Sequence, residues 1–123
     1  MIPLRRLTLL ALGSLAFVAF LRRWRPFPAV VAGESMVPTL APGSFVVATE
    51  RGPVRPGAVV VVARGELEAV KRVASVEDGL VTVLGDNPEH STDSREFGPV
   101  PAEAVRGVVR AVYWPPRRAG LVS

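Results

Sequence analysis

The stretch AVVVVARGELEAVKRVASVEDGLVTVL, residues 58–84, decides the fold. Its Val-rich segments 58–64, 69–76 and 80–84 are separated by short turn sequences, which is the pattern of consecutive β-strands. The four valines at 59–62 do not alternate with polar residues, so we expect both faces of that strand to be buried. Outward from this stretch, segments 44–49 and 105–113 have the same character. The sequence predicts a mostly β fold, a compact barrel-like β-domain.

Length and composition limit what else the chain can contain. Its 123 residues allow one compact domain with an appendage. The chain has no Cys and one His, which excludes disulfide frameworks, thiol nucleophiles, iron–sulfur clusters and zinc sites built from Cys or several His. We therefore expect no metal site of those kinds.

The net charge of +4 is unevenly distributed along the chain. Residues 1–25 carry five Arg and no acidic residue, whereas residues 26–123 carry ten basic and eleven acidic side chains. The β-domain therefore has no excess of positive charge of the kind that nucleic acid requires, and we expect no nucleic-acid partner.

The N-terminal run LTLLALGSLAFVAFL, residues 7–21, predicts a transmembrane helix in the lipid bilayer. As a helix it spans about 22 Å, less than a hydrocarbon core of about 30 Å. Flanking Arg residues and Trp24 can extend the span to the interfaces. The alternative is a signal peptide cleaved after Ala32. The three Arg at 22, 23 and 25, directly after the apolar run, make this less favoured. A buried core helix is less favoured still.

Pro and Gly residues suggest how the chain is divided. Pro26 and Pro28 end the helix and begin an extended segment. We predict an anchor at 1–25, a linker at 26–32, a β-domain at 33–114 and a frayed tail at 115–123.

Lys71 stands out because the chain has fourteen Arg and this one Lys. An amine can lose its proton in an apolar environment and act as a base, whereas a guanidinium cannot. This requires that burial lowers its pKa from about 10.4 toward neutrality. Strand alternation places Ala69, Lys71, Val73 and Ser75 on one face, with Arg72 on the other. The alternative is an exposed Lys that protects an edge strand from aggregation.

A second candidate is Ser35, in GESMVPTL at residues 33–40. Serine is a weak nucleophile and needs a base within hydrogen-bonding reach. Its tight loop follows Gly33 and is stiffened by Pro38. An ordinary turn serine is the alternative.

The polar segment GDNPEHSTDSR, residues 85–95, supplies further candidates. His90, Asp93 and Ser94 are too close in sequence to form a catalytic triad readily. We expect instead that Asp93 and Arg95 form an ion pair and that Ser91 contacts Lys71.

Taken together, these segments resemble the signal peptidase I family of Ser-Lys serine proteases. The matching motifs are GESMVPTL at 33–40, RPGAVVVV at 55–62, VKRV at 70–73 and GDNPEHSTDSREFGPVP at 85–101, in the family's order. The resemblance implies Ser35 as nucleophile, Lys71 as general base and Ser91 as the residue that orients the amine. It further implies that Asp93 and Arg95 support the site, and it implies no metal and no cofactor.

The chain also departs from the family pattern. Some members have a serine two residues before the nucleophile that contributes to the oxyanion hole, and this chain has Gly33 there. That leaves the Ser35 backbone N–H as the expected donor. The accessory β-region of long members is also missing between Ser35 and Lys71.

The resemblance implies a hydrolase, a membrane-anchored endopeptidase that cleaves signal or pro-peptides of precursor proteins after small residues. We expect a single-pass protein with its catalytic domain on the extracytoplasmic face, although the flanking Arg counts do not decide the orientation. Two alternatives stay open: a maturation protease dedicated to one precursor, such as nickel-type superoxide dismutase, and a catalytically silent peptide-binding β-module. A cytosolic self-cleaving repressor would need a DNA-binding region, where this chain has an apolar segment.

Overall fold

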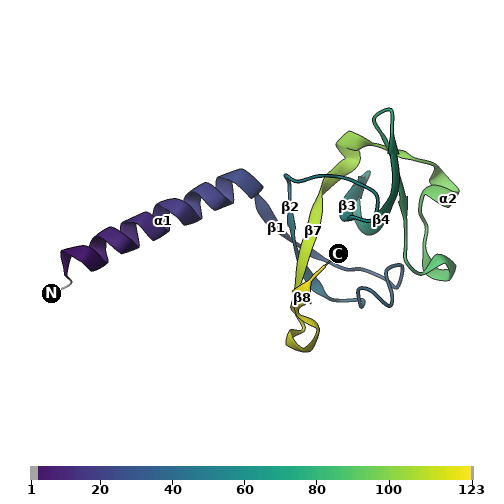
Figure 1. Ribbon diagram of the computed structural model, residues 1–123. Helices are drawn as coiled ribbons and strands as arrows, with labels where there is room; N and C mark the ends of the chain where they lie inside the picture. Colours follow the sequence, from purple (N-terminus) through teal and green to yellow (C-terminus); the bar gives the residue numbers. More distant parts are fainter. Residues whose placement is uncertain (1–2, 123) are drawn as a thin grey trace.

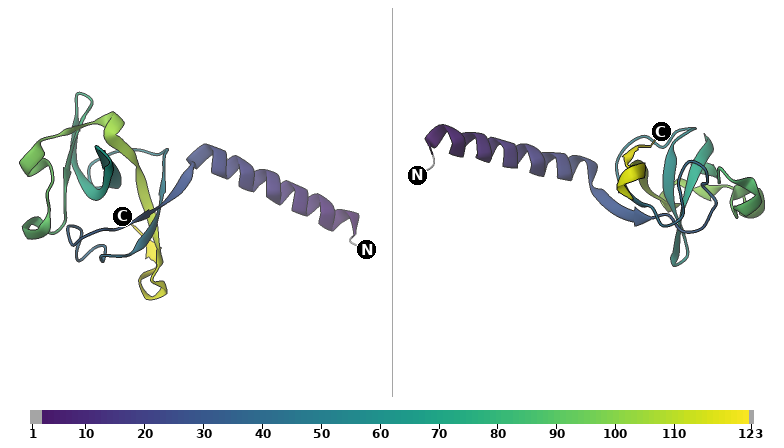
Figure 2. Two further views of the ribbon diagram at one scale, coloured as in Figure 1. Left: turned by 180° about the vertical axis from the view of Figure 1, so that it is seen from behind. Right: turned by 90° about the horizontal axis from the view of Figure 1, so that it is seen from below.

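The computed structural model describes residues 3–122. Met1 and Ile2 of the predicted anchor and Ser123 of the predicted tail lie outside the described residues. Helix α1 (Leu4–Trp24) projects away from a β-domain formed by the rest of the chain (Figure 1). None of its residues is buried, and its mean hydropathy of 1.7 and its length are sufficient to cross a membrane. Both further views show the same projecting helix (Figure 2).

The β-domain is one antiparallel sheet with the strand order β1-β2-β7-β3-β4-β5-β6, and β8 pairs with β7. Its strands are β1 (Pro26–Val30), β2 (Phe45–Thr49), β3 (Val59–Arg64), β4 (Leu67–Glu77), β5 (Leu80–Leu84), β6 (Val100–Pro101), β7 (Val105–Trp114) and β8 (Gly120–Leu121). Short helical turns are η1 (Pro88–His90), α2 (Ser94–Phe97), η2 (Ala102–Ala104) and η3 (Pro116–Arg118). The predicted mostly β fold with an N-terminal apolar helix is confirmed, and the sheet stays open rather than closing into a barrel.

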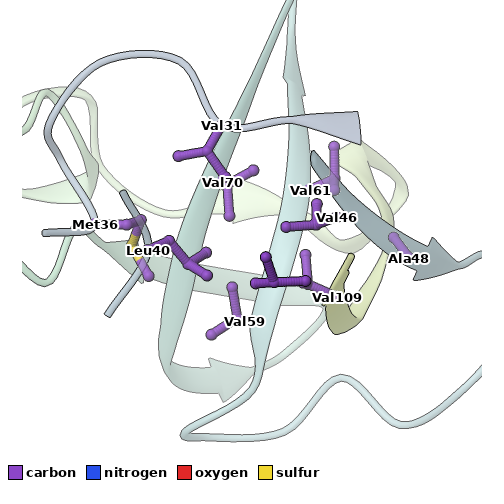
Figure 3. Close-up of a cluster of buried hydrophobic side chains, with 10 residues drawn as sticks. Val31, Met36, Leu40, Val46, Ala48, Val59, Val61, Val70 and Val109 are labelled. Atoms are coloured by element: carbon purple, nitrogen blue, oxygen red, sulfur yellow. The ribbon is translucent and has the colours of Figure 1, made fainter. Parts of the chain in front are cut away.

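Strand β3 lies between β7 and β4 and is buried on both faces, as the valine run predicts. Val59 and Val61 belong to one core cluster, which also contains Val46 and Val109 (Figure 3). Val60 and Val62 belong to a second cluster on the other face. The two clusters fix the register of β3 against β4, because a one-residue slip would exchange the faces.

The hairpin between β4 and β5 turns at Asp78 and Gly79, which both have positive φ, at 52° and 76°. This is the backbone of the tight turn that an Asp-Gly pair favours between antiparallel strands. A register shift lies between Val73 and Ser75, so Ser75 pairs with Thr82 instead of sharing the face of Val73. The predicted placement of Ser75 beside Lys71 is therefore wrong, because a bulge interrupts the alternation.

The segment predicted as a linker is extended, and its residues 26–30 form β1 along β2. Strand β1 is at the edge of the sheet, where Pro26 and Pro28 are tolerated because one side of the strand needs no ladder hydrogen bonds. At the other end of the chain, the predicted tail contains η3 and the two-residue strand β8.

Candidate active site

The segment that carries Ser35 is fixed to the core by two apolar side chains. Met36 and Leu40 are almost fully buried, and the Leu40 backbone N–H donates to the Met36 carbonyl at 2.9 Å. Figure 3 shows both side chains pointing into the first core cluster. Ser35 itself stays half-buried, and its backbone N–H donates to no protein acceptor in residues 3–122. This N–H is available to stabilise an oxyanion.

Lys71 lies in the middle of β4, directly opposite Val60, and is 5% exposed. Burial lowers the pKa of its amine. The negative charge of Asp93 opposes this effect, while the nearby charges of Arg95 and Arg64 lower the pKa further. Lys71 is therefore buried and is not an exposed edge-strand lysine, but its amine lies near charged groups, including the Asp93 carboxylate, instead of in the purely apolar environment that we expected.

The amine of Lys71 begins a chain of hydrogen bonds. Lys71 Nζ donates to Ser91 Oγ at 3.1 Å, and Ser91 Oγ donates to Asp93 Oδ2 at 2.7 Å. A carboxylate is an acceptor only, so the hydroxyl proton of Ser91 is committed to Asp93. The amine must therefore use one of its own N–H groups for Ser91. If the amine is neutral, its lone pair remains free to accept a proton from another direction.

Asp93 is completely buried and holds the end of this chain. Arg95 donates to Asp93 Oδ1 through its backbone N–H at 3.1 Å and through Nε at 2.9 Å, and Arg95 Nη2 contacts Oδ2. The Gly85 backbone N–H also donates to Oδ2, at 2.8 Å. The Arg95 hydrogen bonds are the largest reason that the pKa of Asp93 lies far below its usual value. The expected ion pair between Asp93 and Arg95 is present.

One cavity of about 790 Å³ is lined by both Ser35 and Lys71. Its other walls come from residues 32–34, from the β3–β4 hairpin and from His90 and Thr92. No hydrogen bond joins Ser35 to Lys71 in residues 3–122. Hydrogen bonds between catalytic groups are often formed only when substrate is bound.

The β4 side of this cavity is an unpaired strand edge. Residues 67–72 pair with β3, but the β5 ladder begins only at Arg72, which faces Leu84. The outer edge of residues 67–71 therefore has no strand beside it in the described part of the chain. An extended peptide can add to such an edge through main-chain hydrogen bonds.

Three residues that the sequence reasoning did not assign connect the two halves of the site. Asp86 accepts from Arg72 Nε at 2.8 Å and from Thr39 Oγ1 at 2.5 Å. Asn87 donates through its backbone N–H to the Ser35 carbonyl at 2.7 Å and through Nδ2 to the Glu34 carbonyl at 3.1 Å.

Gly85 is the third of these residues. A Cβ atom there would lie 2.6 Å from Ser91 Cβ and 2.7 Å from the Ser35 carbonyl oxygen. The GDN sequence at the start of the fourth motif, residues 85–101, was the available indication of all three.

The disfavoured set of His90, Asp93 and Ser94 does not assemble. His90 is exposed with Nδ1 4.0 Å from Glu34 Oε2, Asp93 is bound to Arg95, and Ser94 Oγ accepts from the Val83 backbone N–H at 2.9 Å. Within residues 3–122, no three His, Cys, Asp or Glu side chains lie close enough to hold a metal ion.

Comparison with known proteins gives one family. The family described as "Signal peptidase, peptidase S26" matches residues 65–114, a range that includes Lys71 but not Ser35. The chain is 33% identical to the mitochondrial ATP-independent inner membrane protease subunit 1b of Arabidopsis thaliana over 120 residues, covering 72% of this chain and 70% of that protein.

Two other relatives match over shorter ranges. The mitochondrial inner membrane protease subunit 1 of Xenopus tropicalis is 46% identical over 46 residues, and subunit 2 of Danio rerio is 43% identical over 47 residues. These matches cover 37% and 38% of this chain, and the chain spans only 28% and 26% of those relatives. The long alignment and the family match agree: the chain belongs to the signal peptidase family, peptidase S26, and it carries an N-terminal apolar helix.

Proposed function

We propose that this protein is a membrane-anchored serine endopeptidase in which Ser35 is the nucleophile and Lys71 is the general base. The observation that carries the proposal is the buried amine of Lys71, which donates to Ser91 and lines the same cavity as Ser35. Burial lowers the pKa of this amine, which favours the neutral form that a base requires.

In the proposed reaction, neutral Lys71 accepts the hydroxyl proton of Ser35 while Ser35 Oγ attacks the carbonyl carbon of the scissile peptide bond. The Ser35 backbone N–H stabilises the oxyanion, because it donates to no other protein group in residues 3–122. Protonated Lys71 then gives its proton to the leaving amine, and the peptide bond breaks. Lys71 then accepts a proton from a water molecule that attacks the acyl carbonyl carbon, and it returns this proton to Ser35 Oγ as the acyl C–O bond breaks.

The substrate we propose is an extended segment of a precursor protein, bound along the free edge of β4. Leu67, Ala69 and Val70 give the cavity an apolar wall beside Ser35 and Lys71. We propose small side chains before the cut, as in signal or pro-peptides. We propose that the catalytic domain spans residues 33–114, that α1 retains it at the bilayer, and that it faces the extracytoplasmic side.

Depletion of the protein from its own cell tests this function. We expect one or more precursors to accumulate uncut, and N-terminal sequencing of the processed forms to show small residues before the cut. One precursor would indicate a dedicated maturation protease, and many would indicate a general one.

Complementation with variants tests the two catalytic roles. We expect Ser35→Ala and Lys71→Arg to reduce processing at least 1,000-fold, because a guanidinium keeps its charge and cannot act as a base. Arg55→Gln is the matched control and should process normally. Normal processing by Lys71→Arg would refute the base assignment, and a silent peptide-binding module would tolerate both changes.

A further inference from the structure

A cluster of arginines surrounds the junction between α1 and the sheet. Arg22 and Arg23 occupy the last turn of the helix, Arg25 follows it, and Arg51 and Arg110 come from the sheet side. In the described residues, Arg25 is the member of this group with a carboxylate within 4.0 Å, namely Glu50 at 3.7 Å. The other four positive charges have no carboxylate at that range among residues 3–122.

Two of these guanidinium groups lie close to the same indole ring. Arg23 Cζ is 5.6 Å and Arg110 Cζ is 5.4 Å from the Trp24 ring centroid. Neither guanidinium has a carboxylate within 4.0 Å in residues 3–122, so two positive charges lie near this ring without a protein anion to neutralise them. The junction therefore favours an anion from outside the chain.

Two hydrogen bonds fix the orientation of the Arg110 side chain. Its Nε donates to Thr49 Oγ1 at 3.0 Å and its Nη2 donates to the Arg51 carbonyl at 3.3 Å. Gly52 leaves the space for this guanidinium, since a Cβ atom at that position would lie 3.2 Å from Arg110 Cζ. Arg110 is thus fixed beside Trp24.

A cavity of about 230 Å³ opens at this point, lined by Phe20, Trp24, Thr49 and Arg110. Its wall from the membrane helix is apolar, and its wall from the sheet is mostly apolar at the surface but includes the positively charged Arg110 side chain. Phe20 belongs to the apolar run that ends at Leu21, and Trp24 lies about 5 Å farther along the axis, at the level where headgroups begin. A ligand that fits both walls has an apolar chain and an anionic head.

We propose that this junction binds the headgroup of an anionic phospholipid. The phosphate pairs with Arg110 beside Trp24, Arg23 adds positive charge from the end of the helix, and the acyl chain lies along Phe20. This site is separate from the cavity of Ser35 and Lys71, and it depends only on α1 lying in a membrane.

Quenching of Trp24 fluorescence by brominated lipids tests the proposal. The chain has two Trp, so Trp114→Phe leaves Trp24 as the reporter. The full chain carrying this change is reconstituted in vesicles of phosphatidylcholine and phosphatidylglycerol, with one or the other lipid brominated. We expect brominated phosphatidylglycerol to quench Trp24 at least threefold more than brominated phosphatidylcholine at the same mole fraction. High salt should reduce the preference, because it screens the charges.

Substitutions separate this site from general attraction to a charged bilayer. Arg110→Gln and Arg23→Gln should each abolish most of the preference, and Arg23 lies on the exposed end of the helix where its loss leaves the sheet intact. Arg5→Gln, at the opposite end of the same helix, removes the same charge and should leave the preference unchanged. Equal quenching by the two lipids, or equal effects of Arg5→Gln and Arg23→Gln, would overturn the proposal. No result of this experiment depends on proteolysis.

Discussion

Arg72 binds both carboxylate oxygens of Asp86, with Nε 2.8 Å from Oδ1 and Nη2 2.9 Å from Oδ2. Asp86 also accepts from Thr39 Oγ1, so it joins the strand that carries Lys71 to the segment that carries Ser35. The ion pair is mostly buried, with side-chain exposures of 26% and 18%. It lowers the pKa of Asp86, chiefly through the hydrogen bonds from Arg72. Asp86 therefore acts on the proposed reaction as a positioning residue.

We predict that Asp86→Asn lowers both stability and turnover. Loss of the charge-assisted hydrogen bonds should reduce the free energy of unfolding by about 1–3 kcal/mol. The turnover number should fall more than KM changes, because the nucleophile segment loses its connection to β4. Thermal unfolding in detergent and steady-state cleavage measure the two effects. Glu50→Gln breaks the exposed pair with Arg25 and should cost less than about 1 kcal/mol, so equal losses in the two variants would contradict the prediction.

Gly85→Ala should impair the site without a change of charge. The new methyl group would collide with the Ser91 side chain and with the Ser35 carbonyl oxygen. The backbone at Ser35 cannot shift away without a large energetic cost. We expect cleavage to fall at least tenfold, with a loss of stability of about 1–3 kcal/mol. Gly120→Ala is the matched control, since a Cβ atom there meets nothing within 4 Å. Full activity of Gly85→Ala would show that the close packing is not required.

Replacing the buried amine should remove activity and stabilise the fold. The lowered pKa of Lys71 means that the unfolded chain binds a proton more readily than the folded chain. Stability should therefore rise with pH, from the folded pKa up to the ordinary value near 10.5. Lys71→Met should remove this pH dependence and add about 1 kcal/mol near neutral pH. Thermal unfolding between pH 6 and pH 10 checks the prediction, and a destabilised variant at neutral pH would contradict it.

The pH profile of cleavage should respond to Arg64. This guanidinium stacks on Phe97, with Cζ 3.9 Å from the ring centroid, and its charge helps to lower the pKa of Lys71. Activity should rise with pH as the amine loses its proton. Arg64→Gln raises the pKa of Lys71, so the acidic limb of kcat/KM should move to higher pH, while the plateau changes less. Arg55→Gln should leave the pH of the acidic limb unchanged. If the acidic limbs of Arg64→Gln and Arg55→Gln lie at the same pH, Arg64 does not act on the pKa of Lys71.

Much of the sheet was predictable because local sequence and global fold agree. The predicted strands 58–64, 80–84 and 105–113 differ from β3, β5 and β7 by at most one residue at either end. Pro and Gly mark the strand ends, and Asp78-Gly79 forms the turn that its residues favour. Strand β1 was not predicted, because prolines indicate a linker unless the strand is known to be at an edge.

The site was predictable in its residue types and less so in its geometry. Lys71 was singled out because it is the chain's only lysine, and its burial follows from the valine run opposite it. The bulge after Val73 has no marker in the sequence, yet it brings Arg72 opposite Leu84. The contacts of Asp86 and Asn87 with residues 34–39 join segments about fifty positions apart, and strand periodicity alone does not give such contacts.

Two backbone hydrogen bonds hold the C-terminal end of helix α1 against the β-domain. The Glu50 backbone N–H donates to the Arg25 carbonyl at 3.1 Å, and the Arg51 N–H donates to the Trp24 carbonyl at 3.4 Å. A rigid connection of this kind fixes the height of the proposed active site above the bilayer. A precursor's scissile bond must lie at the same height to reach Ser35. The length of the spacer between the precursor's membrane segment and its cleavage site therefore limits cleavage as strictly as the side chains that flank the scissile bond.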